Sequence, residues 1–63
     1  MVMESLMLLP KIERFLRQNA MPPTRFGRLA ANDLRLVGDL RRGREPRGAL
    51  AARVERFIRE YGA

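Results

Sequence analysis

The sequence predicts an all-α domain of four short helices. Apolar residues recur at helical spacing in four separate segments, and the stretches between them contain the Pro, Gly and Asn residues that end helices. No segment alternates apolar and polar residues in the way a β-strand does. A chain of 63 residues has room for one domain, so we expect residues 1–63 to fold as a single unit.

The composition narrows the range of possible functions. The chain contains neither Cys nor His, which removes thiolate and imidazole metal ligands and the usual general base. We therefore expect no enzyme, no metal and no cofactor. The net charge is +6, and residues 25–53 hold eight arginines against three carboxylates. A basic excess concentrated in one segment favours a polyanionic partner.

The first helix is expected from Leu6 to Asn19, or from Leu9 if Pro10 occupies its first turn. Residues 1–5 are expected as a loose tail. The N-terminus lacks the basic start and cleavage site of a signal peptide, and no apolar run is long enough to span a membrane, so the expectation is a cytoplasmic protein. Helical spacing predicts that the buried face is formed by Leu8, Ile12, Phe15 and Leu16.

A second and a third helix are expected in residues 24–43. The second begins at Pro23 or Thr24 and runs to about Ala31, with Phe26, Leu29 and Ala30 facing inward. Ala31-Asn32-Asp33 is the turn, because Asn tolerates left-handed backbone and either Asn32 or Asp33 can cap a helix. The third helix runs from Asp33 or Leu34 to Arg42, buries Leu36, Val37 and Leu40, and ends at Gly43.

The fourth helix is expected from Gly48 or Ala49 to Tyr61. Three ion pairs at i,i+4 spacing are expected on the exposed faces of the helices: Glu13 with Arg17, Glu55 with Arg59, and Arg56 with Glu60. The predicted buried stripe of this helix consists of Leu50, Val54, Phe57, Ile58 and Tyr61.

Three motifs in this region belong together. Phe26-Gly27 pairs a core residue with a small residue where two helices cross, and Val37-Gly38-Asp39-Leu40 spaces two core anchors one turn apart. The stretch 40–46, Leu-Arg-Arg-Gly-Arg-Glu-Pro, has the form L-x-x-G-[KR]-x-P. Together they resemble the helix-turn-helix of the lambda-repressor-like (XRE/Cro-type) family, and the resemblance covers about residues 12–57.

The chain departs from the family pattern at several places. Ala31 stands where Gly is usual, Asn32 where an apolar residue is usual, and Pro22 where a Ser cap is common. The chain also has four predicted helices where relatives often have a fifth that supports dimerisation.

The resemblance implies that the third helix lies in the major groove of DNA. Bases would then be contacted by Leu34, Arg35, Gly38 and Asp39. An arginine reads guanine with two hydrogen bonds, and a carboxylate can accept from the cytosine amine. Phosphates would be contacted by Thr24, Arg25, Arg28, Arg41, Arg42 and Arg44.

Structural alternatives stand beside these roles. Arg35 and Asp39 can form a solvated i,i+4 pair, Leu34 can belong to the core, and Gly38 can allow close helix packing. The arginines at 41, 42 and 44 can be an ordinary solvated helix end.

The function expected from these observations is sequence-specific binding of double-stranded DNA by a transcriptional regulator, as a homodimer on a two-fold site. The alternative is a small protein-interaction module of the transcription or phage machinery that binds DNA only weakly. RNA binding is less favoured because no aromatic residue is placed for base stacking. Binding to a membrane surface is less favoured because the basic residues lie outside the amphipathic first helix.

Overall fold

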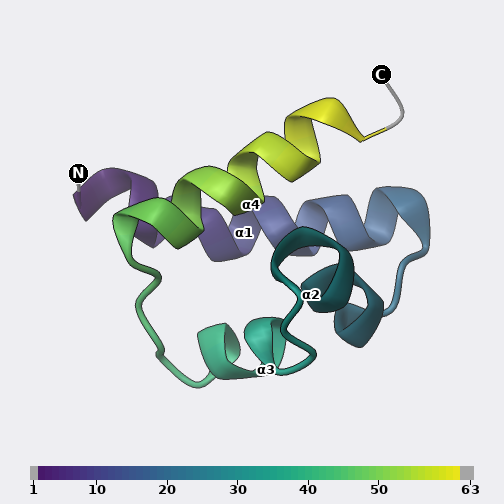
Figure 1. Ribbon diagram of the computed structural model, residues 1–63, viewed down its shortest axis with the longest axis horizontal. Helices are drawn as coiled ribbons and strands as arrows, with labels where there is room; N and C mark the ends of the chain where they lie inside the picture. Colours follow the sequence, from purple (N-terminus) through teal and green to yellow (C-terminus); the bar gives the residue numbers. More distant parts are fainter. Residues whose placement is uncertain (1, 62–63) are drawn as a thin grey trace.

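The computed structural model describes the backbone of residues 2–61 and the side chains of residues 8–61. Its helices are α1 (Val2–Asn19), α2 (Pro23–Ala31), α3 (Leu36–Arg41) and α4 (Gly48–Glu60). Figure 1 shows α1 and α4 lying side by side, with α2 and α3 together on one side of that pair. The described residues contain no strand, so the all-α prediction is confirmed for them. Among them, no helix combines the length and the apolar character that crossing a membrane requires.

Helix α1 begins earlier than predicted. Its backbone is helical from Val2, whereas residues 1–5 were expected as a loose tail and the helix only from Leu6 or Leu9. Pro10 lies inside the helix, where it cannot donate a hydrogen bond to the carbonyl of Leu6. Unbranched residues such as Met3 and Met7 have good helix propensity, which favours continuation through this point. Met1 lies outside the described residues.

The core lies between all four helices and is centred on Phe26, which is completely buried. The ring of Phe26 lies 5.4 Å from that of Phe15 on α1 and 5.5 Å from that of Phe57 on α4, in edge-to-face geometry. Offset and edge-to-face contacts of this kind are the favoured arrangement of aromatic pairs. The buried residues are Leu8, Ile12, Phe15, Leu16, Met21, Phe26, Ala30, Leu36, Val37, Leu40, Ala51 and Val54.

Two predicted core residues are exposed. Leu29 is 46% exposed because it lies off the arc of α2 that buries Phe26, Gly27 and Ala30. Tyr61 is 43% exposed because it follows the last turn of α4 in an extended conformation. One edge of its ring still packs on Phe15, at a centroid distance of 5.2 Å.

The start of α2 and its connection to α3 use the predicted residues. Pro23 occupies the first turn of α2, and its fixed φ suits that place. Asn32 ends the helix in the left-handed conformation at φ 54°, and its backbone N–H donates to the carbonyl of Arg28. Asp33 then begins the next turn, because its carboxylate accepts the backbone N–H of Arg35 at 3.0 Å. The prediction that Asn32 or Asp33 caps the third helix is therefore wrong, because Arg35 occupies the cap position of α3 without a side-chain bond, while Asn32 ends α2 and Asp33 holds the turn.

Helix α3 is shorter than predicted. It begins at Leu36 and ends at Arg41, so Leu34 and Arg35 lie in the turn that precedes it. The backbone N–H of Leu36 donates to the carbonyl of Asp33, which closes a tighter turn than an α-helix has. Leu36, Val37 and Leu40 are buried as predicted, and Gly43 follows the helix with φ at 106°.

Gly27 allows α2 and α3 to cross closely. A Cβ atom at this position would collide with the backbone carbonyl oxygen of Asp33 and would lie 3.2 Å from the Cβ of Leu36. Only glycine lacks that atom, so the predicted need for a small residue after Phe26 is confirmed.

Helix α4 buries Ala51 and Val54, while Leu50, Phe57 and Ile58 are partly buried against the core. The predicted pair of Arg56 with Glu60 is present at 3.5 Å. The other two predicted pairs are wrong, because their carboxylates bind across helices. Glu55 pairs with Lys11 at 3.2 Å and Glu13 pairs with Arg41 at 2.7 Å.

Candidate nucleic-acid interface

The predicted site residues fall into three groups in the structure. The first lies on the exposed face of α2 and the turn after it. Two shallow hollows share Arg28 and Leu34 as common walls. One is completed by Thr24, Arg25 and Leu29, and the other by Asn32, Asp33 and Arg35. Thr24, Arg25, Arg28, Leu29, Leu34 and Arg35, all of them exposed, are called here the α2–turn face.

The guanidinium groups of the α2–turn face are available to a ligand. Arg25, Arg28 and Arg35 make no ion pair with the described carboxylates of residues 8–61. The predicted pairing of Arg35 with Asp39 is therefore wrong in this structure. The backbone of Arg35 is held by Asp33, so the turn fixes where its side chain begins, while its guanidinium pairs with none of the described carboxylates.

Leu34 and Gly38 both face outward. Leu34 is 58% exposed, which rules out the alternative that it belongs to the core. A Cβ atom at Gly38 would meet only the guanidinium of Arg42, at 3.7 Å, so close helix packing does not explain this glycine. An outward glycine in a helix costs about 1 kcal/mol relative to Ala. No side chain therefore projects from the exposed surface of α3 at Gly38.

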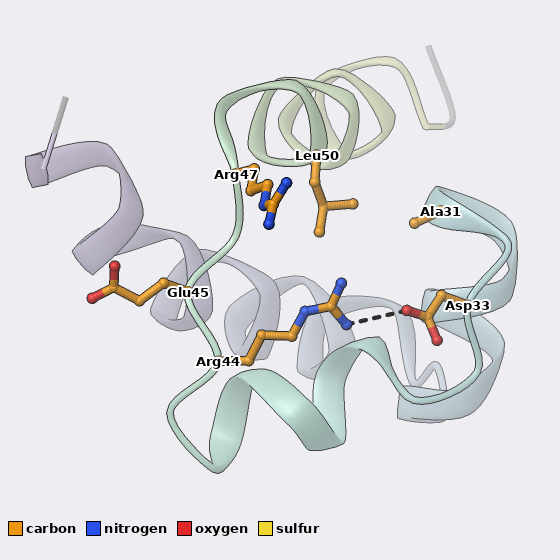
Figure 2. Close-up of a pocket in the computed structure, with 6 residues that line it drawn as sticks. All are labelled: Ala31, Asp33, Arg44, Glu45, Arg47 and Leu50. Atoms are coloured by element: carbon orange, nitrogen blue, oxygen red, sulfur yellow. Dashed lines mark hydrogen bonds and ion pairs between the residues drawn. The ribbon is translucent and has the colours of Figure 1, made fainter.

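The second group is an ion-pair network along the outside of α3. Asp39 binds two arginines, with 2.7 Å from Oδ1 to Nη2 of Arg42 and 3.3 Å from Oδ2 to Nη1 of Arg44. Arg44 also reaches Asp33, at 3.2 Å from Nη1 to Oδ2. Figure 2 shows Arg44 extending from the α3–α4 loop towards Asp33 at the other end of the helix. The network thus connects both ends of α3.

Asp33 is held ionised by its surroundings. The backbone N–H of Arg35 is the main cause that lowers the pKa of the Asp33 carboxyl below its usual range, and the side chain of Arg44 adds to it. Both donors favour the charged form. A carboxylate that stabilises the turn before α3 therefore also restrains an arginine from the loop after it.

The third group is Arg41 alone, which points towards α1 rather than along the α3 surface. It binds Glu13 through two bonds, 2.7 Å from Nε to Oε2 and 2.8 Å from Nη2 to Oε1. This bond from Arg41 is the main cause that lowers the pKa of Glu13, and the same contact raises the pKa of Arg41. Arg41 therefore fastens α3 to α1, which separates it from the other arginines expected to contact phosphate.

Comparison with known proteins assigns the chain to no family. No protein-family model, no curated protein and no solved structure matches the chain.

Two parts of the site were missed from the sequence. The bond between Glu13 and Arg41 joins residues 28 positions apart, and no local spacing indicates such a contact. Leu29 was assigned to the core, although it lines a hollow with Arg25 and Arg28. Its offset from the buried arc of α2 was the available signal.

Proposed function

We propose that this protein binds double-stranded DNA in a sequence-specific manner and regulates transcription. The observation that carries the proposal is the α2–turn face, where three arginines that pair with no described carboxylate lie beside the close crossing of α2 and α3. We assign α2 and α3 to a helix-turn-helix, a motif that docks with its second helix in the major groove. In that pose α3 and the turn before it meet the bases, and the start of α2 meets the phosphates.

Specific roles follow from the positions of the side chains. Arg35 is the base reader, because its backbone is fixed by Asp33 and its guanidinium can meet O6 and N7 of guanine. Leu34 is placed for a thymine methyl group, and the absence of a side chain at Gly38 allows close approach of the helix. Thr24, Arg25 and Arg28 are assigned to phosphates. Two copies on a two-fold site would place half-sites about one helical turn apart.

The test is selection of bound sequences from a randomised duplex library at about physiological salt, where non-specific attraction is reduced. We expect an enriched motif containing guanine, and a palindrome if two copies bind together. Arg35→Ala should lower affinity for the selected duplex by roughly 10-fold or more and change affinity for random duplex much less. Arg59→Ala on α4 removes the same charge from an exposed residue outside the α2–turn face and serves as the matched control.

A second candidate function is binding of a protein partner through the same face. Leu29 and Leu34 are exposed and line one hollow together with Arg25 and Arg28. Apolar side chains bordered by arginines suit an acidic helix with an apolar stripe. The selection separates the two candidates: an absence of enrichment, with binding that simply fades as salt rises, would contradict the DNA-reading proposal and favour this one.

A further inference from the structure

We propose that Asp39 sets the sequence discrimination of this protein by holding Arg42 and Arg44 away from phosphates until its own carboxylate finds a base donor. The inference rests on the proposed function. The observation behind it is that both oxygens of one carboxylate are occupied by two different arginines, at 2.7 and 3.3 Å. The side chain of Arg42 is 72% exposed and that of Arg44 is 40% exposed, so a phosphate can reach either one.

An arginine that leaves Asp39 for a phosphate changes the charge balance around Asp39. An arginine paired with a carboxylate presents little net charge to an approaching phosphate. If phosphates take both Arg42 and Arg44, the carboxylate of Asp39 is left facing a polyanion without either partner. Such an exchange is unfavourable on an arbitrary sequence, because the negative charges repel each other.

One class of sequence removes that disadvantage. Cytosine and adenine each present an exocyclic amine in the major groove, and the cytosine amine is the one that carboxylates usually accept from. Where a cytosine lies opposite Asp39, the carboxylate gains a hydrogen bond as it releases the arginines. Arg42 is then free for the phosphate backbone, and Arg44 keeps one carboxylate partner, Asp33, in place of two. Asp39 in this way couples backbone affinity to base identity.

The chain contains a matched control for the charge. Glu45 lies beside Arg44 in the α3–α4 loop, and in Figure 2 its carboxylate is directed away from the guanidinium of Arg44. It makes no ion pair with the described basic side chains of residues 8–61. Asp39→Asn and Glu45→Gln remove the same charge, but only the first removes the partner of two arginines.

The experiment measures affinity for a random-sequence duplex as a function of salt. With Asp39→Asn we expect affinity to rise about 5-fold at 0.15 M salt and the logarithmic salt slope to steepen by about 0.9, because Arg42 is released while Arg44 keeps its pair with Asp33. A further rise in Asp33→Asn/Asp39→Asn would mark the release of Arg44. Glu45→Gln should give a clearly smaller rise and no change of slope. Equal effects of the two substitutions would overturn the proposal.

A second comparison assigns the gain to the arginines. In a chain that also carries Arg42→Gln and Arg44→Gln, Asp39→Asn should no longer add affinity beyond the control substitution. Persistence of the full gain would overturn the proposal. The substitution keeps the backbone carbonyl of residue 39, which accepts the N–H groups of Arg42 and Arg44 at 3.1 and 2.9 Å. Circular dichroism checks that each variant is folded.

A third comparison separates this inference from the proposed function. Asp39→Asn should lower the ratio of affinity for the selected duplex to affinity for random duplex. The largest part of this change should be a lost preference for cytosine at one position of the selected sequence. An unchanged ratio would overturn the role in discrimination. If the unaltered protein selects no sequence, the proposed function fails, whereas the restraint on Arg42 and Arg44 is still decided by the random-duplex comparison alone.

Discussion

Gly27 and Gly38 lie on opposite sides of the turn between α2 and α3, and they differ in which atoms an added methyl group would contact. At Gly27 the added atom would strike the carbonyl oxygen of Asp33, which is backbone and cannot move aside without displacing the turn. At Gly38 it would touch only the flexible guanidinium of Arg42. The helix crossing thus requires Gly27, whereas the packing of the helices does not require Gly38.

We expect Gly27→Ala to lower the free energy of unfolding by about 1–3 kcal/mol, because overpacking forces the crossing apart. Gly38→Ala is the matched control and should raise it by up to about 1 kcal/mol, since Ala is the better helix former. Urea denaturation of the two variants measures both effects. Equal stability of the two variants would contradict the close crossing at Gly27.

Gly38→Ala also separates folding from binding. Under the proposed function the new methyl group lies between α3 and the bases. We expect weaker binding to the selected duplex in a chain that is at least as stable as the original. Undiminished binding, measured by titration with that duplex, would show that α3 does not approach DNA closely at this residue.

At the scale of the elements, most of the fold could be predicted because local signals define it. Asn32 ends α2 and Gly43 follows α3, as their preference for left-handed backbone predicts, and helical spacing identifies Phe26, Leu36, Val37 and Leu40 as core. The start of α3 could not be placed, because the carboxylate of Asp33 takes the N–H of Arg35 and tightens the turn. Capping competes with helix extension over one or two residues, and composition does not decide between them.

The charged residues of the candidate site were harder to place. Local spacing offered Arg17 to Glu13, Arg59 to Glu55 and Arg35 to Asp39, but each carboxylate has its partner elsewhere. Exposed i,i+4 pairs contribute only a few tenths of a kcal/mol, so a better-placed basic residue easily replaces them. Tertiary packing brings Arg41 to Glu13 and Lys11 to Glu55, and that information is absent from short-range spacing. Asp39 instead takes Arg42 at i,i+3 spacing and Arg44 from the loop.

The contact between α1 and α3 through Glu13 and Arg41 should depend on pH. The folded state lowers the pKa of Glu13 below its usual value near 4.5, so the stabilisation is complete above that value and is lost as pH falls through the lower folded value. The free energy of unfolding should fall as the pH is lowered from 5 to about 3, and we expect this decrease to be smaller in Glu13→Gln than in the unaltered protein. Chemical denaturation at several pH values measures the slope.

Glu45→Gln is the control for that series, because Glu45 makes no ion pair with the described part of the chain. It should leave the slope nearly unchanged. A slope that is the same in the Glu13 variant and in the unaltered protein would contradict a contribution from the pair. Asp33, whose pKa is also lowered, should account for part of the slope that remains.

At the scale of the whole molecule, stability depends on a small core. A domain of this size is expected to have only about 3–5 kcal/mol of net stability from its hydrophobic core. Phe26 is fully buried and its ring contacts two other helices through Phe15 and Phe57. The loss of this one side chain is therefore comparable with the stability of the whole domain.

We expect Phe26→Ala to cost about 3–5 kcal/mol and to leave the chain largely unfolded at physiological temperature. Tyr61→Ala is the comparison, because Tyr61 also belongs to the aromatic cluster but is 43% exposed, and it should cost less. Thermal unfolding followed by far-UV circular dichroism measures both. A cooperative transition of Phe26→Ala close to that of the unaltered protein would contradict the central place of this ring.

The aromatic cluster divides the helices into two kinds by how they are held in the domain. Its rings come from α1, α2 and α4 and from the residue just after α4, whereas α3 contributes none. Helix α3 is held by three aliphatic side chains and by ion pairs at its exposed surface. All three of these aliphatic side chains are buried, so half of the residues of α3 lie in the core. The helix that we propose reads DNA is therefore attached to the domain by aliphatic packing and by ion pairs, and its position does not depend on the aromatic rings.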